Sequence, residues 1–126
     1  MSDAKSLPRL TLVLGGARSG KSRLAEGLIA ATGRPRHYIA TAEAHDDEMR
    51  ARIARHQTDR GPNWQTWSAP RAVAEVLAAI PADAAVLVDC ATLWLSNHLL
   101  AGSDIAKATA DLIAALHACP SPVVVV

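Results

Sequence analysis

Short apolar runs alternate along the chain with longer segments in which apolar residues recur every three or four positions. The first run, Leu10 to Leu14, stops at Gly15-Gly16 and predicts a buried strand that enters a tight loop. From Lys21 onward, helical spacing predicts a helix that ends near Gly33 and Pro35. Its apolar positions are Leu24, Ala25, Leu28, Ile29 and Ala31.

The same alternation continues to the end of the chain. Four further strands are expected at 37–40, 64–67, 84–88 and 123–126, and four further helices at 46–60, 70–80, 93–100 and 104–118. Ser68 and Pro70 resemble an N-cap region that opens the third helix. Strands that alternate with helices at this spacing predict an α/β fold in three layers, with a mainly parallel sheet.

Length and composition favour one domain with a single core. The chain has 126 residues, of which 50% are hydrophobic and only 3% aromatic, so Ala, Val, Leu and Ile must build that core. Lys and Arg number 13 against 12 Asp and Glu, and no global field favours nucleic acid or an anionic membrane. No apolar run approaches the roughly 20 residues that a membrane span needs. The two cysteines, Cys90 and Cys119, form no C-x-x-C pair and have no His at metal-ligand spacing, so we expect a cytoplasmic protein.

The last four residues, Val123 to Val126, predict a central strand buried on both faces. Nothing follows them that could cover the strand or carry chemistry at its carboxyl end. The sequence therefore predicts that residues 1–126 form a single nucleotide-binding domain that lacks its C-terminal part.

One loop carries a phosphate-binding pattern, G-x-x-x-x-G-K-[ST], between the first strand and the first helix. Its residues are Gly15, Gly16, Ala17, Arg18, Ser19, Gly20, Lys21 and Ser22. Glycines let successive N–H groups point inward at the positive end of a helix, where they bind an anion. Lys21 adds a charge for the β and γ phosphates, and the Ser22 hydroxyl can ligate Mg²⁺. The alternative is a glycine-rich turn that binds nothing.

Asp89 closes the apolar strand at 84–88, where an acidic residue would reach the metal or its waters. We favour a shared magnesium site with Ser22, although an aspartate after a strand is also a common turn residue. Asp46, Asp47 and Glu48 are better explained as helix capping than as a metal cluster, because consecutive helical residues point in different directions.

His56 shares a helical face with Met49, Arg52 and Ile53, and Arg60 lies one turn further along. A neutral imidazole beside guanidinium groups could attack a phosphorus while the arginines hold the charged oxygens. Spacing alone favours a solvated or packing histidine over a nucleophile.

Several motifs occur in one order that resembles the bifunctional adenosylcobinamide kinase/adenosylcobinamide-phosphate guanylyltransferase family. They are the loop 15–23, Tyr38-Ile39-Ala40-Thr41-Ala42, Asp46-Asp47-Glu48-Met49, Arg52-Ile53 with His56 and Arg60, and Asp89-Cys90 before Thr92. The resemblance runs from about Leu10 to the final valines and implies a P-loop NTPase-like fold. It also implies phosphorylation of adenosylcobinamide with ATP or GTP, then GMP transfer from GTP through a histidine adduct.

By motif position the histidine that carries GMP resembles His56. The phosphate loop makes Lys21 the second expected catalytic residue, and Asp89 is expected to contact the nucleotide as well as the metal. The resemblance implies further nucleotide contacts at Ala40, Thr41, Ala42, Gln57, Thr58, Asp59 and Arg60. Family members assemble as trimers, so a homo-oligomer is expected. Where the family usually has an acidic nucleotide contact this chain has Ser68, and family chains continue beyond the valine strand.

Two other functions stay open on the sequence. A different small-molecule P-loop kinase would keep the loop and Asp89 but would need no nucleophilic histidine. A noncatalytic nucleotide-binding remnant would bind without turnover. A GTP-binding switch is disfavoured, because the chain has no Asn-Lys-x-Asp sequence to read guanine.

Overall fold

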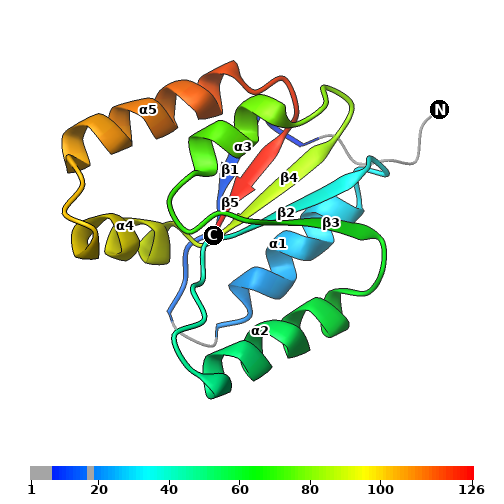
Figure 1. Ribbon diagram of the computed structural model, residues 1–126. Helices are drawn as coiled ribbons and strands as arrows, with labels where there is room; N and C mark the ends of the chain where they lie inside the picture. Colours follow the sequence, from blue (N-terminus) through cyan, green and yellow to red (C-terminus); the bar gives the residue numbers. More distant parts are fainter. Residues whose placement is uncertain (1–6, 17–18) are drawn as a thin grey trace.

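A five-stranded sheet forms the centre of the protein, and helices cover both of its faces (Figure 1). The computed structural model describes residues 7–16 and 19–126. In chain order the elements are β1 (Leu10–Leu12), α1 (Lys21–Ala30), β2 (Arg36–Ala40), α2 (Asp47–Arg60), β3 (Trp64–Ser68), α3 (Val73–Ala79), β4 (Ala85–Asp89), α4 (Ala91–Leu100), α5 (Ile105–Ala118) and β5 (Val123–Val125). No helix among these is long and apolar enough to cross a membrane.

Every strand pair is parallel, and the strand order across the sheet is β1-β5-β4-β2-β3. Figure 1 shows α1 and α2 on one side of the sheet and α3 and α5 on the other. The predicted three-layer α/β fold is therefore confirmed. Because the strands are parallel, the residues that follow β1, β2 and β4 meet at one edge of the sheet.

The neighbouring strands β4 and β5 divide their side chains between two cores. In β4, Val86 and Val88 pack with α3 and α5, whereas Ala85 and Leu87 pack with Ala25 and Ile29 of α1. The terminal valines follow the same alternation, with Val123 in the first core and Val124 in the second. This period of two is what a strand buried on both faces requires.

The expectation that nothing covers the terminal valines was wrong. Val123, Val124 and Val126 are buried, with exposed fractions of 1%, 0% and 6%. The helices that cover β5 come earlier in the chain, because the crossovers between parallel strands place helices on both faces of the sheet. The last strand, β5, then lies between β1 and β4.

Three local expectations also differ from the structure. The first strand was expected to be buried, but β1 is an edge strand of the sheet, and Leu10 and Leu12 are 44% and 59% exposed. Leu24 is 58% exposed, and the buried face of α1 is formed by Ala25 and Ile29 instead. Ser68 does not belong to an N-cap region, because it is the last residue of β3 and pairs with Ala40. The residue before α3 is Ala72, which makes no side-chain cap. Ser68 forms strand hydrogen bonds in β3 instead of capping α3.

Candidate nucleotide-binding and transfer site

The glycine-rich loop connects β1 to α1 and ends on Gly20, the N-cap of α1. Gly20 has a φ of 82°, a left-handed backbone conformation that residues other than glycine rarely adopt. Ser19 N–H donates to the Gly16 carbonyl at 3.2 Å, and Lys21 Nζ donates to the same oxygen at 3.2 Å. The ammonium group is thus held over the loop. Ala17 and Arg18 lie outside the described residues.

The first cavity opens beside this loop and has a volume of about 480 Å³. The loop and α1 supply one wall, and α2 supplies the facing wall with His56, Asp59 and Arg60. Its other lining residues are Ser19, Gly20, Lys21, Ser22, Arg23, Glu26 and Tyr38. Four cationic or imidazole side chains therefore surround the N-terminus of α1, an arrangement suited to anionic groups.

The second cavity adjoins the first and has a volume of about 310 Å³. Ser22, Tyr38, His56 and Arg60 line both cavities. The remaining wall of the second cavity is mainly apolar, with Ala40, Ala42, Met49, Ile53 and Leu93, together with Arg52, Gln57 and Asp89. The predicted α2 face of Met49, Arg52, Ile53, His56 and Arg60 is therefore confirmed as one face, and it lines this cavity.

Asp89 stands at the centre of a polar network between the two cavities. Its Oδ2 accepts a hydrogen bond from Ser22 Oγ at 3.0 Å and another from Tyr38 Oη at 2.6 Å. Burial, and after it the negative charge of Asp89, raises the pKa of Tyr38 far above its usual value. Tyr38 therefore stays protonated and remains a donor to Asp89.

Arg60 connects this network to the helix that carries His56. Its guanidinium carbon lies 3.5 Å from the centroid of the Tyr38 ring, a close cation–π contact. Its Nε is buried and has no hydrogen-bond partner among the described residues. An unpaired buried donor is costly, so a ligand oxygen that reached this nitrogen would relieve the cost.

Ser22 and Asp89 also fit the part that two protein residues play at a phosphate-bound Mg²⁺. Both supply oxygen atoms, which are the ligands that Mg²⁺ prefers, and the two oxygens already lie 3.0 Å apart. The described residues contain no cluster of three or more His, Cys, Asp or Glu side chains that could hold a metal ion. The remaining ligands would have to be phosphate oxygens and water.

Some of the other residues predicted to contact the nucleotide line the two cavities, and some do not. Ala40, Ala42 and Gln57 line the second cavity, and Asp59 lines the first. Thr58 is exposed, and its hydroxyl donates to the Ala54 carbonyl within α2. Thr58 and Ser68 line neither cavity.

Thr41 lines neither cavity and is completely buried. Its Oγ1 accepts from the Cys90 N–H at 2.7 Å and donates to the Cys90 carbonyl at 2.8 Å, while its own N–H donates to the Asp89 carbonyl. The Thr41 carbonyl accepts from Asn97 Nδ2 at 2.8 Å. Thr41 and Asn97 thus hold the chain on either side of Asp89. No local sequence motif predicted this role.

Thr41→Val should lower the free energy of unfolding by about 1–3 kcal/mol, because valine keeps the shape but leaves the Cys90 N–H without its acceptor. Urea unfolding monitored by circular dichroism measures this loss. Thr58→Val is the matched control and should stay within about 0.5 kcal/mol of wild type, since Thr58 is exposed. Equal losses in the two variants would contradict the role given to Thr41.

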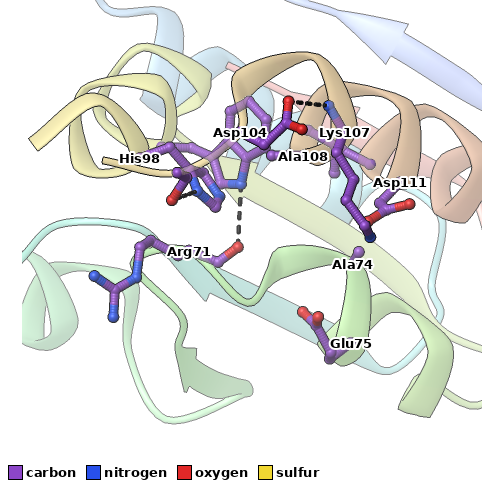
Figure 2. Close-up of a pocket in the computed structure, with 11 residues that line it drawn as sticks. Arg71, Ala74, Glu75, His98, Asp104, Lys107, Ala108 and Asp111 are labelled. Carbon is purple, nitrogen blue, oxygen red and sulfur yellow. Dashed lines mark hydrogen bonds and ion pairs between the residues drawn. The ribbon is translucent and has the colours of Figure 1, made fainter. Parts of the chain in front are cut away.

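A third cavity, of about 210 Å³, lies among α3, α4 and α5 (Figure 2). Trp94 Nε1 donates to the Arg71 carbonyl at 3.2 Å, and His98 Nδ1 lies 2.8 Å from Ser103 Oγ. Lys107 forms an ion pair with Asp111. None of the predicted site residues lines this cavity. The contact between His98 and Ser103 lies at the corner between α4 and α5, and the Trp94 hydrogen bond ties α4 to the segment before α3.

A glycine-rich loop between β1 and α1, followed by Lys21 and Ser22 and faced by Asp89 at the end of β4, defines a protein with a P-loop NTPase-like fold of the α/β class. Comparison with known families narrows this class. The chain belongs to the cobinamide kinase / cobinamide phosphate guanyltransferase family, whose sequence model matches residues 11–126.

Three curated relatives carry the name bifunctional adenosylcobalamin biosynthesis protein. CobP of Pseudomonas aeruginosa is 54% identical over 90 residues, a stretch that covers 71% of this chain and 52% of the relative. CobU of Salmonella typhimurium is 39% identical over 133 residues, and CobU of Escherichia coli is 38% identical over 133 residues. Each CobU match covers 93% of this chain and 73% of the relative. The chain thus spans about half the length of the Pseudomonas relative.

Proposed function

We propose that this protein phosphorylates adenosylcobinamide with ATP or GTP and then transfers GMP from GTP to adenosylcobinamide phosphate, in adenosylcobalamin biosynthesis. The transfer proceeds through a GMP adduct on His56. One observation carries the proposal: His56 lines both the charged cavity beside the phosphate loop and the apolar cavity next to it. A nucleophile at that boundary can reach the α-phosphorus, which joins the phosphates to the nucleoside.

The two cavities suggest how a nucleotide is divided between them. Phosphate oxygens are held by the N–H groups of the loop 15–22 and by Lys21 in the first cavity. The nucleoside occupies the second cavity against Ala40, Ala42 and Gln57, with Arg60 at the junction and Asp59 in the first cavity. Thr41 contributes through the backbone on either side of Asp89, which its hydrogen bonds hold in place, whereas Thr58 lines neither cavity.

In the kinase step, the cobinamide hydroxyl oxygen attacks the γ-phosphorus, and the bond from this phosphorus to the β–γ bridging oxygen breaks. Lys21 neutralises the charge that develops on that oxygen. Mg²⁺ bound by Ser22 and Asp89 would supply further positive charge to the phosphate oxygens. The acceptor hydroxyl must also lose its proton, so this step needs a base.

In the guanylyl step, a neutral His56 nitrogen attacks the α-phosphorus of GTP, and pyrophosphate leaves. An oxygen of cobinamide phosphate then attacks the same phosphorus and releases the imidazole, which divides one difficult displacement into two easier ones. The Arg60 guanidinium, with its unpaired Nε, is suited to hold the charged oxygens during both displacements.

Two incubations test the proposal. Protein incubated with GTP labelled at the α-phosphorus should retain label after denaturation, whereas γ-labelled GTP should leave none, because the adduct keeps only the α-phosphorus. The bound label should be lost in acid and survive mild base, as expected of a phosphoramidate. Retention of the γ label, or of neither label, would refute the histidine adduct.

The family resemblance supports a proposal about assembly, and the two free cysteines, Cys90 and Cys119, support one about location. We propose that the active form is a homo-oligomer, most simply a trimer, and that it works in the cytoplasm. Sedimentation of the purified protein measures the first, and fractionation of cells measures the second.

A further inference from the structure

Glu26 is a carboxylate of the first cavity that no motif singled out. It lies four residues after Ser22 on α1, so the two side chains share one face of the helix. Lys21 lines the cavity on the same wall, and His56 and Arg60 line it from α2. Glu26 is partly buried, in contrast to most acidic side chains of the described helices.

Charges from three elements act on Glu26 within this cavity. Burial raises its pKa above the usual value for glutamate, and Asp89 adds to the rise, while Arg60, His56 and Arg23 oppose it. Lys21, Tyr38 and Asp59 complete the set of titratable groups that line the same space. A carboxylate whose pKa is raised binds a proton more strongly and is a better general base near neutral pH.

The other carboxylates near the loop are less suited to take a proton from a substrate. Asp89 Oδ2 already accepts from both Ser22 and Tyr38. Asp59 lines the first cavity too, but it is exposed, near the end of α2. Glu26 is the partly buried carboxylate among the described residues that line the first cavity, and it makes no hydrogen bond to another described residue.

We propose that Glu26 is the general base of the kinase step. As the cobinamide hydroxyl oxygen bonds to the γ-phosphorus, its proton passes to a Glu26 carboxylate oxygen. The bond from the γ-phosphorus to the bridging oxygen breaks, and the nucleoside diphosphate leaves with the electron pair. The assignment rests on the proposed function, and it gives the two half-reactions different requirements, because attack by a neutral imidazole does not use this base.

Glu26→Gln should reduce kcat for phosphate transfer from γ-labelled nucleotide to adenosylcobinamide by about 100-fold or more, the usual effect of losing a general base. Formation of the α-labelled adduct should remain unchanged. Glu26→Asp keeps the carboxylate and should retain part of the rate. Glu75→Gln is the matched control, since Glu75 is exposed on α3 across the sheet, and it should change neither reaction.

Two further measurements separate a base from a structural residue. In the wild type, kcat/KM for phosphorylation should fall as the pH drops through the raised pKa of Glu26, because the base becomes protonated, and Glu26→Gln should lack this fall. The raised pKa also means that the ionised carboxylate is less favourable in the folded than in the unfolded state. The Gln variant should therefore unfold at a temperature no lower than that of the wild type near neutral pH.

The experiments give different results if Glu26 is not the base and if the proposed function is wrong. Wild-type protein that makes neither labelled product would refute the proposed function. An active wild type whose Glu26→Gln variant keeps its kinase rate would overturn only the role of Glu26, as would equal loss of both half-reactions. If the Gln variant does not fold, the wild type and Glu26→Asp are compared instead. A fall in kcat/KM at acidic pH in both proteins supports Glu26 as the base. The absence of this fall in both proteins overturns that role.

Discussion

Replacing His56 with Asn should abolish the covalent GMP adduct and GMP transfer while phosphorylation of adenosylcobinamide continues at a substantial rate. Asparagine keeps a polar side chain on the exposed face of α2 but has no nitrogen that can attack phosphorus. The kinase step uses the cobinamide hydroxyl as its nucleophile and therefore does not need the imidazole. Label from α-labelled GTP on denatured protein and label from γ-labelled nucleotide on cobinamide measure the two reactions separately.

His45→Asn provides the same substitution at an exposed histidine that precedes α2, and both activities should survive it. Retention of α label in the His56→Asn variant would mean that another residue carries GMP. Equal loss of both activities would instead assign His56 a structural role.

Replacing Lys21 with Ala should weaken binding of MgGTP by about 100-fold or more, because a charge-assisted hydrogen bond to phosphate contributes about 1.5–3 kcal/mol and Lys21 can make more than one. The domain should stay folded, since the ammonium group lies over the loop at the Gly16 carbonyl and does not enter either core. Titration calorimetry gives the affinity, and circular dichroism of the same sample confirms the fold.

Lys107→Ala serves as the control, because Lys107 is an exposed lysine on α5 that pairs with Asp111. Its affinity for MgGTP should equal that of the wild type. An unchanged affinity in Lys21→Ala would refute the phosphate-loop assignment, and loss of cooperative unfolding would show that Lys21 supports the fold.

The layered fold was predictable because each of its signals is local. The alternation of Ala85, Val86, Leu87 and Val88 between two cores follows from the period of a strand, and it needs no knowledge of the neighbouring strands. Asp46 was predicted to cap a helix, and its carboxylate accepts from the Met49 N–H at 2.7 Å. The loop at 15–22 combines motif and context in one short segment, so it too could be recognised.

The hydrogen bonds that hold the site residues in place could not be predicted, because they join segments that are far apart in the sequence. Tyr38 donates to Asp89, which lies 51 positions later, and only the pairing of β2 with β4 makes them neighbours. Asn97 reaches the Thr41 carbonyl from α4 across 56 positions. His37 Nδ1 accepts a hydrogen bond from Trp67 Nε1 at 3.0 Å across 30 positions, and burial lowers the pKa of His37. Sequence spacing carries no signal for such pairs.

The helix that carries His56 is also the one least secured to the rest of the molecule. None of the residues of α2 is buried or packs in either core, whereas α1, α3, α4 and α5 each contribute side chains to one of the two cores. Helices with few buried contacts open at low cost, so its amide hydrogens should exchange with solvent well before those of β4 and β5. Four arginines, Arg50, Arg52, Arg55 and Arg60, make the opened helix a substrate for trypsin. A nucleotide that spans both cavities would hold α2 against α1 and β2, so resistance to cleavage becomes a measure of occupancy.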